Sequence, residues 1–307
     1  MRIVFLGTPA FAVPALEALA GTSGMTVTAV VCQPDRPAGR GGKLRAPAVK
    51  QAAGKFHLPV YQPERMRGEA ALAWLVAQRP DALAVIAFGQ LLPAPVFSLP
   101  HYGAINAHAS LLPQYRGAAP IQWALANGEA QTGVTTMCIN AGLDTGDILL
   151  QRPLAIGASE TAPELSDRLA KLAAELMVAT FTGLATATLT PRPQPASATL
   201  APLLSREDGR VNWQWPAQQI YNRWRGFQPW PGLHTRFRDR QLAILRCHPL
   251  ADIAAEAGLV VDTNGTLTVA CGGGGLALDE VRPEGRHAMS GADFARGARL
   301  TANQKLQ

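Results

Sequence analysis

The stretch "RIVFLGTPAFAVPALEALA", residues 2–20, decides the fold class of the N-terminal part of the chain. Residues 2–7 form a nearly continuous apolar run that ends in glycine, which is typical of a strand buried on both faces. Residues 11–20 then repeat apolar side chains at helical spacing. This strand–turn–helix order is that of a nucleotide-binding α/β fold, but the turn lacks the G-x-G-x-x-G spacing and only Gly7 matches it. We therefore expect an α/β fold without a dinucleotide site.

The alternation of apolar runs and helical patterns continues as far as residue 156. It predicts a Rossmann-like α/β architecture, in which a mostly parallel sheet is covered by helices on both faces. The strands are expected at residues 2–7, 25–33, 81–89, 103–110 and 133–140, with a further extended stretch at 146–156.

A segment rich in proline, serine, threonine and alanine, residues 190–202, interrupts this pattern and predicts a semi-extended linker. Beyond it, short alternating stretches separated by turn residues predict a smaller β-barrel domain, open and OB-like. We expect an α/β domain at 1–189, a linker at 190–205 and the C-terminal β-barrel domain at 206–307.

The composition is that of a globular protein. Hydrophobic residues make up 48% of the 307 residues, and no apolar run reaches the ~18 residues of a membrane-spanning helix. A signal peptide is not expected, because the N-terminal stretch is already explained as a strand and a helix. The four cysteines lie far apart without a C-x-x-C pair, which predicts reduced thiols in a cytoplasmic protein. The net charge of +6 weakly favours a polyanionic partner.

Asn106 and His108 are polar residues inside the expected strand 103–110, and residues two apart on a strand share one face. Asp144 lies in "AGLDTGDILL" between Gly142 and Gly146, where a loop can approach a ligand closely. An amide and an imidazole that stabilise an oxyanion, with a carboxylate that orients the imidazole or moves protons, suit acyl transfer. From the spacing alone, a hydrogen-bonded core pair and a structural turn aspartate explain these residues equally well.

Seven segments together resemble the 10-formyltetrahydrofolate-dependent formyltransferases: "FLGTPAFAVPALEAL", "CQPDRPAGRGGKLRAPAVK", "VIAFGQLLP", "INAHASLLPQYRGAAPIQWA", "GLDTGDIL", "GFQPWPG" and "HAMSGADFARGARL". They occur in the order of that family and extend almost to the end of the chain. The resemblance implies transfer of a formyl group from 10-formyltetrahydrofolate to an amine, with Asn106, His108 and Asp144 as the catalytic residues. The residues that it assigns to the folate cosubstrate are Phe88, Gly89, Gln90, Leu91, Leu92, Ser110, Leu111, Leu112 and Pro113.

The segment "PDRPAGRGGKLRAPAVK", residues 34–50, carries five basic residues and a single acid. Alone, it is typical of a solvated surface loop. By the resemblance, it is the insertion that reaches the acceptor arm of initiator methionyl-tRNA, whose amino group receives the formyl group, and its cations bind phosphate. Gly42 and Leu203 stand where the family commonly has lysine. The residues assigned to tRNA are Arg36, Arg40, Lys43, Arg45 and Arg206.

Three other functions explain part of this pattern. A formyltransferase for a small amine, such as an amino-sugar nucleotide or glycinamide ribonucleotide, would need neither the basic segment nor the C-terminal domain. A tRNA-binding protein with a vestigial site would not need an intact set of Asn106, His108 and Asp144. A metal-dependent hydrolase is disfavoured because His108 has no second histidine at ligand spacing, so no metal site is expected. The sequence carries no signal for an oligomer, and we expect a monomer.

Overall fold

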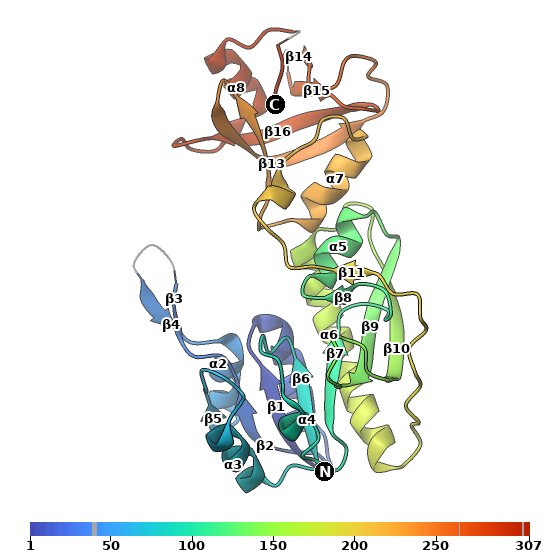
Figure 1. The fold of residues 1–307 in the computed structure, drawn as a ribbon. Helices are drawn as coiled ribbons and strands as arrows, with labels where there is room; N and C mark the ends of the chain where they lie inside the picture. Colours follow the sequence, from blue (N-terminus) through green and yellow to red (C-terminus); the bar gives the residue numbers. More distant parts are fainter. Residues whose placement is uncertain (39–41, 264, 303) are drawn as a thin grey trace. The chain divides into compact units, whose positions relative to one another are not determined.

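The computed structural model describes residues 1–38, 42–263, 265–302 and 304–307. The chain divides into two compact units (Figure 1). Unit 1 comprises Met1–Pro120, Gln131–Ala155 and Leu165–Pro202, whereas unit 2 comprises Ile121–Ala130, Ile156–Glu164 and Leu203–Gln307. Unit 2 therefore takes two short segments from the part of the chain that precedes residue 165.

The seven strands of the main sheet in unit 1 are β1 (Arg2–Gly7), β2 (Thr26–Val31), β5 (Val60–Tyr61), β6 (Ala82–Ile86), β7 (Ala104–His108), β9 (Gln131–Cys138) and β10 (Ile148–Ala155). Their order is β10-β9-β7-β6-β1-β2-β5, and the five strands from β7 to β5 are parallel. This confirms the predicted mostly parallel α/β sheet. The ends of each predicted strand differ by at most three residues from those of an observed strand. Of the seven strands in this sheet, only the two-residue strand β5 was not expected.

Strand β1 shows that both faces of this sheet are covered. Its residues 3–6 point alternately to opposite faces, and all four are fully buried. On one face, Val4 and Leu6 pack in a cluster with side chains of α3 (Glu69–Gln78) and α4 (Ala94–Phe97). Two further helices, α1 (Val13–Gly21) and α2 (Ala48–Lys55), contact β2. Burial on both sides explains why the sequence of β1 is continuously apolar.

Strand β9 runs antiparallel to β7 and β10 runs antiparallel to β9, and these two strands form one edge of the sheet. Strand β10 is the edge strand, and most of its residues after Leu149 are half-buried or exposed. Pro153 is tolerated there because an edge strand does not need every backbone N–H for pairing. An antiparallel pair can be joined by a short loop, and the loop between β9 and β10, residues 139–147, carries Asp144.

Two small sheets belong to unit 1. Strand β3 (Arg36–Ala38) pairs with β4 (Lys43–Arg45) as an antiparallel hairpin, and β8 (Arg116–Gly117) pairs in parallel with β11 (Leu200–Ala201). Strand β11 comes from the proline-rich segment whose composition predicts a linker. In the structure, residues 190–202 run along unit 1 and are hydrogen-bonded to it.

The helix α6 (Ala162–Ala185) begins directly after Thr161. The backbone N–H and the hydroxyl of Thr161 both donate to Oε2 of Glu164, at 2.8 and 2.7 Å, which satisfies a donor at the start of the helix. None of the helices within the described ranges, α6 included, combines the length and the apolar character that a membrane crossing needs. Two other elements of the N-terminal half are η1 (Ala10–Ala12) and α5 (Pro120–Ala126).

Unit 2 is built on an antiparallel sheet that confirms the predicted smaller β domain. Its strands are β12 (Leu233–Phe237), β13 (Arg240–Leu250), β14 (Val260–Asp262), β15 (Leu267–Ala270), β16 (Gly275–Pro283) and β17 (Met289–Ser290). The order is β12-β13-β16-β15-β14, with β17 paired to β16, and register shifts in β13 bend the sheet. The remaining elements are η2 (Glu207–Gly209), α7 (Ala217–Gly226) and α8 (Gly291–Ala298).

Arg225 on α7 is an interior cation of unit 2, with 4% of its surface exposed. Its guanidinium donates to the carbonyl oxygens of Gly157 and Glu160 and to the side-chain oxygen of Asn222. Burial lowers the pKa of Arg225 from its ordinary value. These contacts make Arg225 a link between α7 and the segment 156–160, and it is too buried to bind a phosphate.

The four cysteines are free thiols that we expect to be unreactive. Burial raises the pKa of Cys32 to about 11 and that of Cys271 to about 12, and it also raises the pKa of Cys138 and Cys247. Because the thiolate is the reactive form and only about one Cys32 thiol in a thousand is ionised at pH 8, the reaction of Cys32 with a disulfide reagent should be slow. A disulfide reagent should therefore titrate the thiols quickly in guanidinium and very slowly in the native protein. A native thiol as reactive as free cysteine would contradict this burial.

Candidate active site

Strand β7 presents Asn106 and His108 on one face, as their spacing predicts. The strand lies between β6 and β9, where Asn106 pairs with Val85 on one side and Met137 on the other. His108 is only 6% exposed, whereas Asn106 is half-buried. The side-chain amide of Asn106 has no hydrogen-bond partner among the described residues. An amide in that position is available to a ligand.

The two ring nitrogens of His108 both face oxygen atoms. Nε2 lies 2.8 Å from the carbonyl oxygen of Tyr115, and this nitrogen carries the proton because a carbonyl can only accept. Nδ1 lies 3.6 Å from Oδ2 of Asp144, which is within ion-pair distance but longer than a hydrogen bond. The imidazolium form of His108 therefore has an Nδ1–H that faces Asp144 and can still donate to an oxygen atom of a ligand.

Asp144 is held against His108 by the backbone that follows β7. Its Oδ2 accepts a hydrogen bond from the N–H of Gly117 at 2.9 Å, and its side chain is 13% exposed. The φ angle of Asp144 is 51°, in the left-handed region, which residues other than glycine adopt rarely, although aspartate tolerates it better than most. Such a conformation persists only where the surrounding structure holds it.

The loop that carries Asp144 is closed tightly on itself. Oδ1 of Asn140 accepts from the N–H of Gly142 at 3.0 Å and from the hydroxyl of Thr145 at 2.8 Å. A Cβ atom on Gly146 would lie 1.7 Å from the carbonyl oxygen of Cys138. The sequence predicts that these glycines allow close approach of a ligand. The structure shows that Gly146 allows close approach of the protein's own backbone.

The loop after β6, residues 88–92, offers backbone groups to a ligand. Phe88 is 2% exposed and its carbonyl accepts two side-chain hydrogen bonds. The side chain of Gln90 is also committed, because its amide bonds to the backbone of residues 63–66. Within the described ranges, the backbone groups of the four residues after Phe88 have no hydrogen-bond partner, and Leu91 is 85% exposed.

The loop after β7, residues 110–113, is tied to the neighbouring strands. Ser110 is fully buried, and its hydroxyl donates to a backbone carbonyl at 2.5 Å. Thr135 donates to the Ser110 carbonyl at 2.7 Å and accepts from the N–H of Leu112 at 3.0 Å. Gln151 donates to the Leu112 carbonyl at 2.7 Å. Since these polar groups already have partners and Leu112 and Pro113 are buried, the loop offers a ligand mainly the apolar side chain of the half-buried Leu111.

The β3–β4 hairpin carries three cations on one face. Arg36 lies directly opposite Arg45, and Lys43 lies two residues before Arg45 on the same strand, so the three side chains share a face. All three are exposed, and none forms an ion pair within the described part of the chain. Figure 1 shows the hairpin extending away from the sheet of unit 1. Like charges directly opposite one another are unfavourable, and a bound anion would offset their repulsion.

Asp35, the one acid of the segment 34–50, does not neutralise these cations. Its carboxylate lies 2.8 Å from Nζ of Lys50 and accepts a hydrogen bond from Gln62, also at 2.8 Å. The hydrogen bond from Gln62, followed by the contact with Lys50, holds the pKa of Asp35 below its ordinary value. Lys50 is therefore paired, whereas the three hairpin cations are not.

Two further residues assigned to tRNA complete the predicted set. Arg40 lies outside the described residues. Arg206, directly before η2 in unit 2, is exposed and donates a hydrogen bond to the side-chain oxygen of Gln241. A guanidinium has five N–H donors, so Arg206 keeps most of them for another partner.

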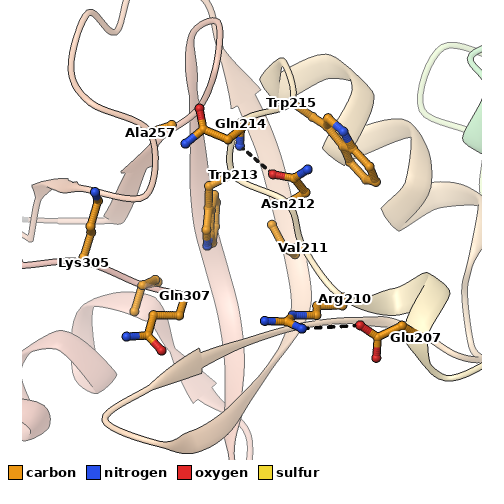
Figure 2. Close-up of a pocket in the computed structure, with 11 residues that line it drawn as sticks. Glu207, Arg210, Val211, Asn212, Trp213, Gln214, Trp215, Ala257, Lys305 and Gln307 are labelled. Atoms are coloured by element: carbon orange, nitrogen blue, oxygen red, sulfur yellow. Dashed lines mark hydrogen bonds and ion pairs between the residues drawn. The ribbon is translucent and has the colours of Figure 1, made fainter.

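Unit 2 contains a pocket of about 560 Å³ that none of the predicted site residues lines (Figure 2). Both of its cations are already paired, Arg210 with Glu207 and Lys305 with Glu256. The indole N–H of Trp213, which also lines it, donates to a buried hydroxyl. Neither this pocket nor the rest of the described ranges groups three His, Cys, Asp or Glu side chains as metal ligands.

The structure adds contacts that the sequence patterns did not predict. The carbonyl of Tyr115 and the N–H of Gly117 hold His108 and Asp144, respectively. Gln194 donates a hydrogen bond to the carbonyl of Asp144, 50 residues earlier in the chain. The local sequence gives one signal for this contact, because Gln194 is a long polar amide between two prolines.

Comparisons with known proteins place this arrangement in a family. The formyl transferase profile matches residues 1–181, and the profile of the formyl transferase C-terminal domain matches residues 203–299. A methionyl-tRNA formyltransferase of Solibacter usitatus is 54% identical over 308 residues, which cover 100% of this chain and 98% of that protein. One from Acidobacterium capsulatum is 51% identical, with 100% and 99% covered.

A solved structure shows a similar fold. It is an N-formyltransferase from Helicobacter canadensis in complex with folinic acid and dTDP-3-aminofucose. The TM-score is 0.67 at 16% identity, and the match covers 91% of this chain and 98% of that one. The family profiles and the two relatives confirm the resemblance found in the sequence, and the chain belongs to the formyl transferase family.

Proposed function

We propose that this protein transfers the formyl group of 10-formyltetrahydrofolate to the α-amino group of methionyl initiator tRNA, giving N-formylmethionyl-tRNA for translation initiation. The observation that carries the proposal is that Asp144 faces His108, while Asn106 lies on the same face of β7 and is paired with β6, the strand that leads into the loop 88–92. Two relatives named for this activity share more than half of their residues with the chain over almost their whole length, which supports the choice of substrate.

The three side chains have complementary roles when a neutral amine attacks the formyl carbon. The amide of Asn106 and the Nδ1–H of His108 donate to the formyl oxygen as it becomes an oxyanion. The carboxylate of Asp144 stabilises the positive charge on the imidazole that it faces. Through a water molecule, Asp144 also accepts the proton that the amine releases, and this proton is returned to N10 of the departing tetrahydrofolate.

We assign the folate cosubstrate to the loops 88–92 and 110–113. A pterin ring has donors and acceptors along its edge and apolar faces above and below. The unpaired backbone groups after Phe88 suit the edge, and Leu91 with the apolar surface of the second loop suits the faces. The side chains of Gln90 and Ser110 support these loops, since both already have hydrogen-bond partners.

We assign the acceptor arm of the tRNA to the cationic face of the β3–β4 hairpin, with Arg40 and Arg206 as further phosphate contacts. A small amine substrate needs no such polyanion surface, so the hairpin favours tRNA over an amino-sugar nucleotide. In this proposal residues 1–189 form the catalytic domain, 190–205 a linker that runs along unit 1 as far as residue 202, and 206–307 the tRNA-binding domain of a monomer. The cytoplasm, where initiator tRNA is used, is the proposed location.

The experiment that tests the proposal supplies 10-formyltetrahydrofolate with methionyl initiator tRNA or with an amino-sugar nucleotide. We expect formylated tRNA and an unchanged sugar. Formylation of the sugar and not of the tRNA would make the protein a small-amine formyltransferase. Binding of both tRNA and folate with no transfer to either acceptor would indicate a tRNA-binding protein with a vestigial site.

Replacing Arg45 by glutamine is expected to weaken tRNA binding and to reduce its dependence on salt. Each lost phosphate contact lowers the slope of log affinity against log salt concentration by about 1. The measurement is the tRNA dissociation constant over a series of salt concentrations. Lys171→Gln, at an exposed position on α6, removes the same charge away from the hairpin and should leave the slope unchanged. A wild-type slope in Arg45→Gln would contradict the assignment of the hairpin.

A further inference from the structure

We infer that Gln194 is a positioning residue for Asp144, a role that rests on the proposed function of Asp144 in formyl transfer. Gln194 lies in unit 1, in the proline-rich segment that precedes residues 203–307 of unit 2. Among residues 190–200, all of which the structure describes, every other side chain is exposed and that of Gln194 is half-buried. A long amide turned inward from an extended, exposed segment requires partners inside the protein.

Both ends of the Gln194 amide have such partners. Nε2 donates to the carbonyl oxygens of Asp144 and Gly146, at 2.8 and 2.7 Å. Oε1 accepts from Nε and Nη2 of Arg116, at 3.1 and 2.6 Å. Glutamate could replace the acceptor but not the donor, and lysine could replace the donor but not the acceptor. The contacts therefore require an amide at this position.

Together with Gly117, these bonds form a closed network around Asp144. The N–H of Gly117 binds the carboxylate of Asp144, while the neighbouring Arg116 binds Gln194, which in turn binds the Asp144 carbonyl. The φ angle of 51° at Asp144 is a conformation that the surroundings must hold. Gln194 fixes the backbone of Asp144, and this fixes the direction in which its carboxylate points toward His108.

The segment itself is anchored on both sides of Gln194 by backbone pairing. Arg192 and Ile148 exchange two backbone hydrogen bonds of 2.8 and 2.9 Å. On the other side, β11 pairs with β8, and Figure 1 shows the two strands side by side. These anchors do not involve the Gln194 side chain. A substitution of that side chain should therefore leave the segment in place and release only the loop 139–147.

The test compares Gln194→Leu and Gln194→Glu with Ser197→Ala, which changes an exposed side chain of the same segment. In both Gln194 variants we expect kcat for formyl transfer to fall by about 10–100-fold, as for a small misplacement of a reacting group. The KM values for 10-formyltetrahydrofolate and methionyl-tRNA should stay within about twofold of wild type. Ser197→Ala should behave as wild type. Gln194→Glu keeps the acceptor for Arg116, so wild-type kcat in this variant would overturn the proposal.

Two further results separate positioning from a general loss of stability. In an Asp144→Asn background, Gln194→Leu should add little to the loss of kcat, whereas an additive loss would overturn the proposal. Amide hydrogen exchange of residues 139–147 should be faster in Gln194→Leu than in wild type, with exchange in β1 and β2 unchanged. Equal exchange of that loop would overturn the proposal whatever the substrate. Failure of the proposed function would show separately, as absence of tRNA formylation by the wild type.

Discussion

His108→Ala is expected to lower kcat for formyl transfer by about 10³-fold while leaving the affinity for tRNA nearly unchanged. The substitution removes the buried Nδ1–H that faces Asp144, and with it one of the two donors that the proposed mechanism directs at the formyl oxygen. It also leaves Asp144 without the imidazole that it faces. The measurement is single-turnover formylation at saturating 10-formyltetrahydrofolate, combined with tRNA binding at equilibrium.

The matched control for this prediction is His101→Ala. His101 belongs to the same unit but is exposed. Its ring packs against that of Tyr102, with the ring centroids 4.6 Å apart. It should retain wild-type kcat. Asp144→Asn should lose activity to a similar extent as His108→Ala, because the neutral amide neither stabilises the imidazolium nor accepts the proton. Transfer by His108→Ala at more than a tenth of the wild-type rate would exclude the proposed role of the imidazole.

Gly146→Ala is expected to destabilise the protein and to inactivate it. The added Cβ would lie 1.7 Å from the carbonyl oxygen of Cys138, so the backbone of β9 or of the loop 139–147 must move. Overpacking of this kind typically costs about 1–3 kcal/mol of unfolding free energy. Because the same loop holds Asp144 in its left-handed conformation, the movement also displaces the carboxylate from His108. The measurements are the midpoint of urea unfolding and kcat on the folded fraction.

Gly54→Ala is the control for the destabilisation. Gly54 lies within α2, and a Cβ atom there would meet nothing within 4 Å. Alanine favours a helix over glycine, so this variant should be more stable than wild type by about 0.4–1 kcal/mol. If Gly146→Ala had the wild-type midpoint of urea unfolding and the wild-type kcat, this would contradict the close approach of Gly146 to the backbone of Cys138.

The architecture could be predicted from the sequence because its signals are local. A continuous apolar run such as residues 2–7 shows that a strand is buried on both faces, and helical spacing identifies the segments that cover it. Strand β5 was not expected, since its two residues are too few to give a pattern. The antiparallel direction of β9 relative to β7 was not predicted either, because a helix lies between the two strands and strand direction then depends on the path of the chain.

The candidate site could be predicted in part, because some of its signals are also local in the sequence. The spacing of Asn106 and His108 places them on one face of a strand, and the glycines around Asp144 mark a tight loop. Only the folded structure shows that Oδ2 of Asp144 lies 3.6 Å from Nδ1 of His108, because the two residues are 36 positions apart in the chain. The cationic segment 34–50 was evident in the sequence, but which of its cations stay free was not. Pairing of Lys50 with Asp35 and alignment of Arg36 with Arg45 depend on the helix and hairpin that form there.

The sequence by itself determined the α/β class and the β-rich C-terminal part, and its resemblance to the formyltransferases singled out the three residues of the candidate site. The first two depend on residue types at short, regular spacing, which is a property of one strand, helix or loop. The tertiary structure decided how those residues are held. His108 depends on the Tyr115 carbonyl, and Asp144 depends on the Gly117 N–H and on Gln194. Hydrogen bonds between segments distant in the chain leave no periodic pattern, because the partners are brought together only when the sheet forms.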